Sequence, residues 1–170
     1  MALEVSAVSN PRFPLKESDQ KKLVKLYLND VGILTDILYR FNVTAVLQDI
    51  ASINLGTVYE SVVAQELAAH GFELHYYDNK QKGEVDFLID DFERLSVMPI
   101  EVKSGKDYTR HRALTKFLEN EEYGIREACV LSNAREVYES EGVTYMPVYY
   151  IMFFSNTPPA TDRLILPALI

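Results

Sequence analysis

The spacing of apolar residues changes from helical to alternating at Gly71, and this change constrains the fold more than any other feature of the chain. Before Gly71, residues 57–70 place apolar side chains at helical intervals, and a glycine directly after such a run often ends a helix. After it, residues 72–77 and 84–89 alternate apolar and polar side chains, as half-buried strands do. Residues 97–103 repeat the alternation, so we expect one helix followed by three strands.

The second half of the chain extends this order. Residues 110–120 have the spacing of a helix, and residues 127–132 form a short apolar run typical of a buried strand. We expect a further helix at 133–140 and a last strand, or pair of strands, at 144–154. The order helix, three strands, helix, strand predicts an α/β fold around a three-stranded mixed sheet.

The ends of the chain are expected to lie outside this core. Residues 1–50 predict an irregular and helical extension, because two prolines limit helix formation early and apolar residues then recur at helical spacing over 21–34. A short helix is expected at 43–53. We place the core at 51–154 and a proline-interrupted tail at 155–170.

Composition excludes several classes of protein. Seventeen basic residues against 25 acidic ones give a net charge of −8, which rules out a broad basic surface that binds nucleic acid by charge alone. The single cysteine, Cys129, excludes a disulfide framework and a cysteine-rich zinc site, and its apolar neighbours predict a buried thiol. No apolar run approaches the roughly 20 residues of a membrane span, and no secretory signal begins the chain. We therefore expect a cytoplasmic protein without a membrane partner.

Acidic residues gather on the second and third expected strands. Residues two apart on a strand share a face, so Glu101 and Lys103 point the same way, and Asp86 can stand beside Glu101 if the strands are neighbours. Clustered carboxylates repel each other unless a positive charge lies between them, and an all-oxygen ligand set suits Mg²⁺ or Mn²⁺. The backbone carbonyl of Val102 can add a ligand, and Glu60 in the preceding helix can supply a further carboxylate.

Lys103 gives this cluster a possible chemistry. It can orient or help deprotonate a water molecule whose pKa the metal lowers, which is a way to hydrolyse a phosphodiester. The alternative is simple: many strand faces alternate Glu and Lys as solvated ion pairs that contribute little to stability.

These residues resemble the E…D…ExK signature of the PD-(D/E)xK, or restriction-endonuclease-like, superfamily. The chain is most similar to one branch of it, the C-terminal nuclease-like domain that follows an AAA-type ATPase module in many bacterial and archaeal ATPases. The similarity runs from about Arg12 to about Tyr150. It is carried by the segments KLYLNDVGIL (25–34), GTVYE (56–60), VAQEL (63–67), EVDF (84–87) and PIEVKSG (99–105).

The resemblance implies a restriction-endonuclease-like fold with Asp86, Glu101 and Lys103 at the metal and water positions and Glu60 at the helical acidic position. It also implies an ATPase module as partner, in cis or in trans. The chain contains no Gly-x-x-x-x-Gly-Lys-Ser/Thr motif, so it is either a fragment of a longer ATPase or a domain that stands alone. We expect a fragment.

Local charge bears on the substrate. Between residues 102 and 116 five basic residues face one acidic residue, and they can contact phosphates beside the metal or simply form a solvated helix face. The candidate phosphate contacts are Lys106, Arg110, Arg112 and Lys116, in addition to Lys103.

Two functions follow from these features. The first is a metal-dependent nuclease domain of an AAA-type ATPase that acts on DNA. The second is a non-catalytic regulatory or protein-interaction module that retains the nuclease fold. The net charge of −8, the aromatic run 145–154 and the apolar tail favour contacts with protein over contacts with DNA.

Overall fold

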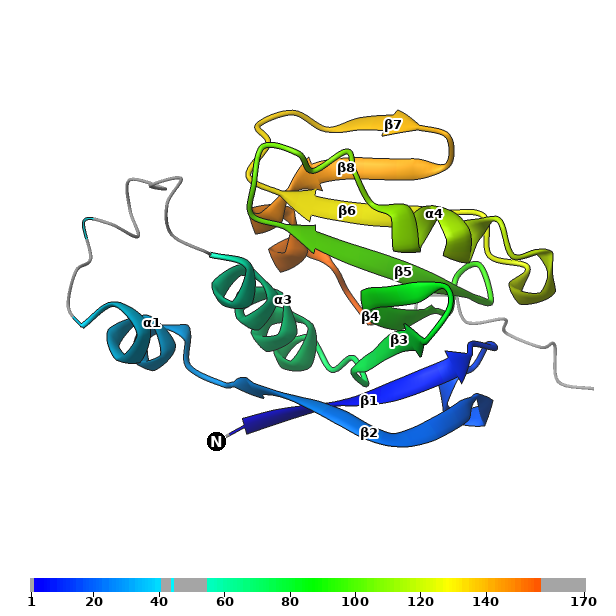
Figure 1. Ribbon diagram of the computed structural model, residues 1–170, viewed down its shortest axis with the longest axis horizontal. Helices are drawn as coiled ribbons and strands as arrows, with labels where there is room; N and C mark the ends of the chain where they lie inside the picture. Colours follow the sequence, from blue (N-terminus) through cyan, green and yellow to red (C-terminus); the bar gives the residue numbers. More distant parts are fainter. Residues whose placement is uncertain (1, 41–43, 45–54, 157–170) are drawn as a thin grey trace, which may run out of the picture.

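The computed structural model describes residues 2–40, 44 and 55–156. Its centre is an eight-stranded mixed sheet (Figure 1) with the strand order β2-β1-β3-β4-β5-β6-β8-β7. The pairs β1–β3, β5–β6 and β6–β8 are parallel, and the other neighbours are antiparallel. The strands are β1 (Ala2–Asn10), β2 (Asp19–Leu28), β3 (His75–Asn79), β4 (Gly83–Asp91), β5 (Ser96–Lys103), β6 (Ala128–Ser132), β7 (Tyr138–Ser140) and β8 (Val143–Pro147).

Two helices, α3 and α4, flank the sheet, and a third, α1, follows β2. The connection from β5 to the parallel strand β6 must cross over a face of the sheet, and α4 lies in this connection. None of the described helices combines the length and apolar character that a membrane crossing needs. The helices are α1 (Val31–Tyr39), α3 (Gly56–Ala69) and α4 (Arg112–Leu118), with 3-10 segments at Leu15–Glu17, Glu121–Tyr123 and Val148–Phe153.

The core order predicted from the sequence is confirmed. Helix α3, strands β3 to β5, helix α4 and strand β6 follow one another as expected, with boundaries shifted by a few residues. Gly71, just after α3, has a φ of +82°, a left-handed conformation that glycine adopts easily and that ends the helix. The sheet is much larger than the three strands expected, because strands join it at both edges.

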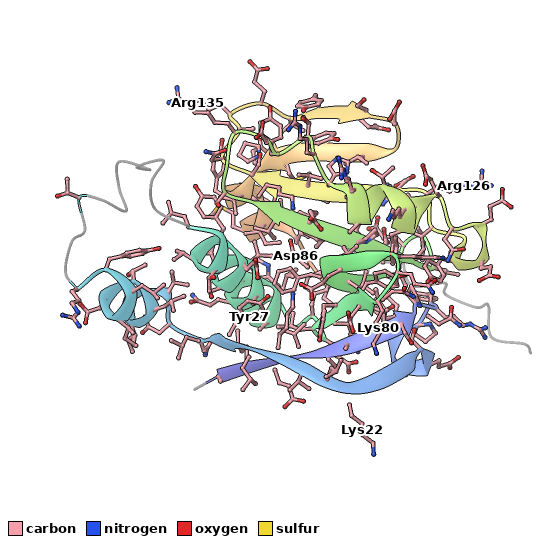
Figure 2. All side chains as sticks on the ribbon, in the orientation of Figure 1. Lys22, Tyr27, Lys80, Asp86, Arg126 and Arg135 are labelled. Carbon is pink, nitrogen blue, oxygen red and sulfur yellow. The ribbon has the colours of Figure 1, made fainter. Side chains whose placement is uncertain are left out.

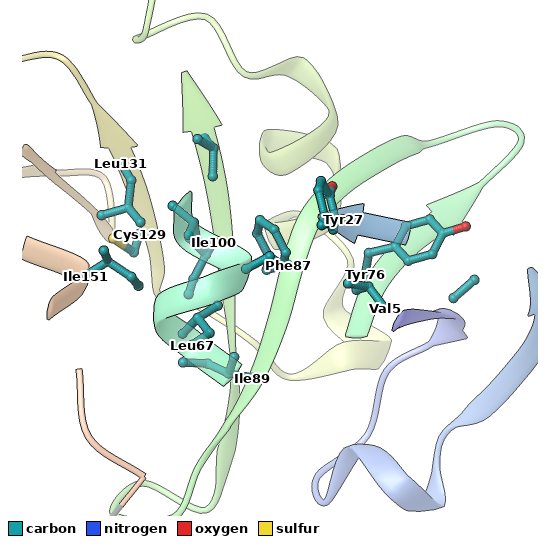
Figure 3. Close-up of a cluster of buried hydrophobic side chains, with 14 residues drawn as sticks. Val5, Tyr27, Leu67, Tyr76, Phe87, Ile89, Ile100, Cys129, Leu131 and Ile151 are labelled. Carbon is teal, nitrogen blue, oxygen red and sulfur yellow. The ribbon is translucent and has the colours of Figure 1, made fainter. Parts of the chain in front are cut away.

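Two hydrophobic cores hold the layers together. The first lies between α3 and the sheet, where Leu67 of α3 and Phe87 and Ile100 of the strands are fully buried (Figure 3). The second lies between α4 and the opposite face, and Phe117 of α4 is fully buried there. Cys129 belongs to the first core, and burial raises the pKa of its thiol to about 12, so the prediction of a buried thiol is confirmed.

The prediction of an irregular and helical extension at residues 1–50 is wrong for most of the described part. Strands β1 and β2 form a hairpin that joins the main sheet through β3. Leu23 and Leu26 are 52% and 67% exposed on the edge strand β2, so their helical spacing does not mark a buried face. Ala7 and Val8 of β1 are buried on opposite faces of the sheet, which removes the alternation that would have indicated a strand.

Two later predictions are corrected as well. The expected helix at 133–140 is a turn followed by β7, whose Tyr138 stacks on Tyr145 of β8 with ring centroids 4.7 Å apart. In the run 144–154 only β8 is a strand, and a 3-10 segment follows Pro147. The helix expected at 43–53 and nearly all of the tail at 155–170 lie outside the described residues.

Candidate functional site

The site lies where the pairing between β4 and β5 ends. The last recorded pair is Phe87 with Ile100, so Asp86 and Glu101 occupy the next positions of the two neighbouring strands. Beyond this pair, the backbone N–H of Val102 donates to Asp86 Oδ2 at 2.8 Å. The expected meeting of Asp86 with Glu101 on neighbouring strands is therefore confirmed.

Glu101 and Lys103 form a close ion pair on β5. Lys103 Nζ lies 2.5 Å from Glu101 Oε1, and the Glu101 side chain is only 6% exposed. The second oxygen, Glu101 Oε2, is buried and has no hydrogen-bond partner among the described residues. A buried carboxylate oxygen without a donor is costly, so this atom is available to a ligand that brings positive charge.

Glu60 reaches the same site from α3, and the N-terminal hairpin holds it there. Tyr27 of β2 donates its hydroxyl hydrogen to Glu60 Oε2 at 2.8 Å. Figure 2 shows Tyr27 and Asp86 beside α3. The charge of Glu60 contributes to the raised pKa of Asp86, so Glu60 acts on the same site.

A second lysine stands at the border of the site. Lys25 of β2 lies with its Nζ 2.5 Å from Glu84 Oε1 and 4.7 Å from the centre of the Tyr76 ring. Burial lowers the pKa of Lys25, but Glu84, Asp86 and Glu60 outweigh this effect and the net shift is upward. Lys25 is therefore a permanent cation at neutral pH.

Two carboxyl groups of the site, Asp86 and Glu101, resist ionisation. Burial, with the charges of Glu101 and Glu60, raises the pKa of Asp86 to about 8. Burial also raises the pKa of Glu101, although Lys103 opposes this effect. Neighbouring carboxylates with raised pKa values hold protons that a metal ion can replace.

Lys103 is held in its charged form. Burial lowers the pKa of Lys103, but the charges of Glu101, Asp86 and Glu60 outweigh burial and raise it above its ordinary value. A lysine with a raised pKa does not act as a base near neutral pH. The site therefore supports the orienting role expected for Lys103 over the proton-accepting one.

The donor set fits a hard divalent cation. Among the described residues no three His, Cys, Asp or Glu side chains converge as a metal cage. Mg²⁺, however, needs only one or two carboxylates and keeps several waters. Asp86 and the unpartnered Glu101 Oε2 supply two carboxylates, and the carbonyl of Val102 lies at the same strand edge as its N–H, toward Asp86. One oxygen of Glu60, Oε2, already accepts a hydrogen bond from Tyr27.

The metal-free protein is expected to lose stability as the pH rises from about 5 to about 8. The folded Asp86 keeps its proton over this range, whereas the unfolded chain, with a pKa near 3.8, has lost it. Stability then falls by up to about 1.4 kcal/mol per pH unit, or roughly 3–6 °C in melting temperature.

The measurement is thermal unfolding in a chelator across this pH range, for the wild type and for Asp86→Asn. Because other groups titrate in both proteins, the informative quantity is the difference between their melting temperatures. The melting temperature of Asp86→Asn should rise relative to that of the wild type as the pH rises. A difference that stays constant with pH contradicts the raised pKa of Asp86.

The remaining predicted residues lie on the surface next to the site. Lys106, Arg110, Arg112 and Lys116 are all exposed, on the loop that follows β5 and on α4. Their role as phosphate contacts stays a prediction.

Two cavities of about 360 Å³ each lie at the other end of β4 from Asp86. Asp90 and Phe92 line both of them, whereas Asp86 and Glu101 line neither. We therefore assign these cavities no part in the carboxylate site.

Sequence reasoning missed Lys25 and Tyr27 as members of the site. Both lie on β2, which was expected to be helical and outside the core. The available signal was the segment 25–34, which contains both residues and is one of the segments that led us to expect a nuclease-like domain.

Comparison with protein families matches residues 55–151 to DUF4143, described as a domain of unknown function. The match covers more than half of the chain and includes Glu60, Asp86, Glu101 and Lys103. No curated protein and no solved structure gives a significant match.

Proposed function

This chain belongs to the DUF4143 family, and we propose that its carboxylate site hydrolyses DNA phosphodiesters with a divalent metal ion, Mg²⁺ or Mn²⁺. The observation that carries the proposal is the meeting of Asp86, Glu101 and Lys103 at the end of the β4–β5 pairing, with the charge of Glu60 acting on Asp86 from α3. A solvated ion pair on a strand face has no reason to bury Glu101 or to leave its second oxygen without a donor.

Each residue has a separate role in this proposal. Asp86, Glu101 and the Val102 carbonyl would hold the metal, which would polarise the phosphate and lower the pKa of a water. Lys103, as an ammonium group, would orient the attacking water and stabilise the charge that develops on the phosphate. Glu60 adds negative charge from α3 and would help to orient water at the site.

We extend the proposal to fold and partner. The order α3, β3 to β5, α4, β6 supports a restriction-endonuclease-like core within the larger sheet. The motifs shared with the nuclease-like branch support an AAA-type ATPase module as partner and a cytoplasmic location.

The test is a cleavage assay on single-stranded and double-stranded DNA with Mn²⁺, with Mg²⁺ and with a chelator. We expect cleavage with either metal and none with the chelator, because the lysines alone cannot generate a nucleophile at neutral pH. Cleavage that persists in the chelator contradicts the metal-dependent mechanism. A protein that neither cleaves nor responds to metal points to the second candidate.

The second candidate is the non-catalytic interaction module, and exposed apolar side chains favour it. Tyr149, Met152 and Phe153 of the 3-10 segment are 58%, 55% and 70% exposed, and Leu26 and Ile37 near the β2 edge are 67% and 62% exposed. Such residues suit contacts with another protein surface. The two functions are compatible within one chain, and only metal dependence separates a catalytic domain from an inactive one.

A further inference from the structure

We propose that Lys25 is a phosphate-contacting residue of this site. In the metal-free protein it balances the carboxylates, and once a divalent ion has taken over that balance it contacts a phosphate of DNA. The inference rests on the proposed function, because it concerns the same site, but it adds a residue that lies outside the matched segment 55–151.

The position of Lys25 gives it access to both the site and the solvent. Its ammonium group lies above the Tyr76 ring, 4.7 Å from the ring centre, and 2.5 Å from Glu84 Oε1. The side chains of Lys25 and Glu84 are 22% and 47% exposed, so solvent reaches the ion pair on the Glu84 side. Partly exposed pairs of this kind contribute little to stability. A phosphate that approaches the site can therefore replace Glu84 as the partner of Lys25.

The charges of the site explain when this exchange occurs. Among the described residues, Glu84, Asp86 and Glu60 raise the pKa of Lys25, and Glu101, Asp86 and Glu60 raise the pKa of Lys103. A divalent ion held by Asp86 and Glu101 would add positive charge beside these carboxylates and weaken their attraction for the two lysines, so both lysines would become available to an incoming anion.

The N-terminal hairpin is fixed to the site, which keeps Lys25 in reach. Lys25 pairs with Val5 in the β1–β2 ladder, and Tyr27, two residues along, is buried and donates to Glu60. Lys22 lies on the same strand but is exposed and points away from the sheet (Figure 2). Lys22 is therefore a matched control for the charge of β2.

The test measures DNA binding without cleavage, in a Lys103→Ala background with Mn²⁺, over a series of salt concentrations. Lys25→Met should weaken binding several-fold and make the slope of log K against log salt shallower by about 0.9 for duplex or about 0.7 for single strands. Lys25→Arg, which keeps the charge, and Lys22→Met should each match the background protein. A slope unchanged by Lys25→Met, or changed equally by Lys22→Met, overturns the inference.

A second variant protects the test against misfolding of Lys25→Met. Glu84→Gln removes the partner of Lys25 at an exposed position, so DNA binding in a chelator should strengthen several-fold. No strengthening overturns the inference.

Failure of the proposed function is seen separately. Suppose that Mn²⁺ raises the melting temperature of the wild type but Lys25→Met leaves the slope of log K against log salt unchanged. Only the proposed role of Lys25 is then contradicted. If Mn²⁺ has no effect on the wild type, the proposed function and this inference both fall.

Discussion

Lys103→Ala is expected to lower the rate of DNA cleavage by at least about 100-fold while leaving the stabilisation by Mn²⁺ in place. The substitution removes the ammonium group that contacts Glu101 and that the proposed mechanism assigns to orienting the attacking water. Loss of a group that acts on a proton or on developing charge in the transition state typically costs 10²- to 10⁴-fold in rate. Metal binding should persist, because Asp86 and Glu101 remain.

The measurement pairs cleavage rates with melting temperatures, each with and without Mn²⁺. Lys22→Ala serves as the control, since it removes an exposed lysine of β2 that points away from the sheet. It should cut DNA nearly as the wild type does. Unchanged cleavage in Lys103→Ala contradicts the mechanism, and loss of the Mn²⁺ effect would mean that Lys103 acts only by keeping Glu101 in place.

Asp86→Asn is expected to abolish the stabilisation by Mn²⁺ without unfolding the protein. The amide oxygen of Asn can still accept the hydrogen bond from the Val102 N–H, so the local backbone contact survives. The variant also relieves the repulsion from Glu101 and Glu60. In a chelator at pH 8 the variant should be at least as stable as the wild type. A lost response to Mn²⁺ can then be attributed to the loss of the Asp86 carboxylate as a metal ligand.

Asp107→Asn is the matched control for this prediction. Asp107 is exposed in the loop after β5, and the substitution removes the same charge without touching the site. It should keep the full response to Mn²⁺. A response lost equally in both variants would point to a general effect of charge instead of a site at Asp86.

The core order was predictable because each of its elements has a clear local pattern. Helix α3 ends at a glycine, and β4 and β5 alternate apolar and polar residues up to the site. The N-terminal hairpin lacks such a pattern, since β1 is covered on both faces and β2 exposes Leu23 and Leu26. Its place in the sheet depends on parallel pairing with β3, about 70 residues away, which no local spacing reveals.

The site, like the fold, was predictable for the residues on β4 and β5 but not for those on the N-terminal hairpin. Asp86, Glu101 and Lys103 lie on adjacent strands, so their spacing along the chain indicated that they meet. The ion pair of Lys25 with Glu84 spans 59 residues, and the bond of Tyr27 to Glu60 spans 33. Both contacts depend on the packing of the hairpin against α3 and the sheet, and periodicity carries no information about that packing.

Thermal unfolding of the wild type and Asp86→Asn, with and without Mn²⁺, tests the central claim most directly. Mn²⁺ at ten times its dissociation constant should stabilise the folded wild type by about 1.4 kcal/mol, which corresponds to a rise of roughly 3–6 °C in melting temperature. The account predicts this rise in the wild type and its absence in Asp86→Asn. No rise in the wild type, or an equal rise in both proteins, contradicts a metal site at Asp86 and Glu101.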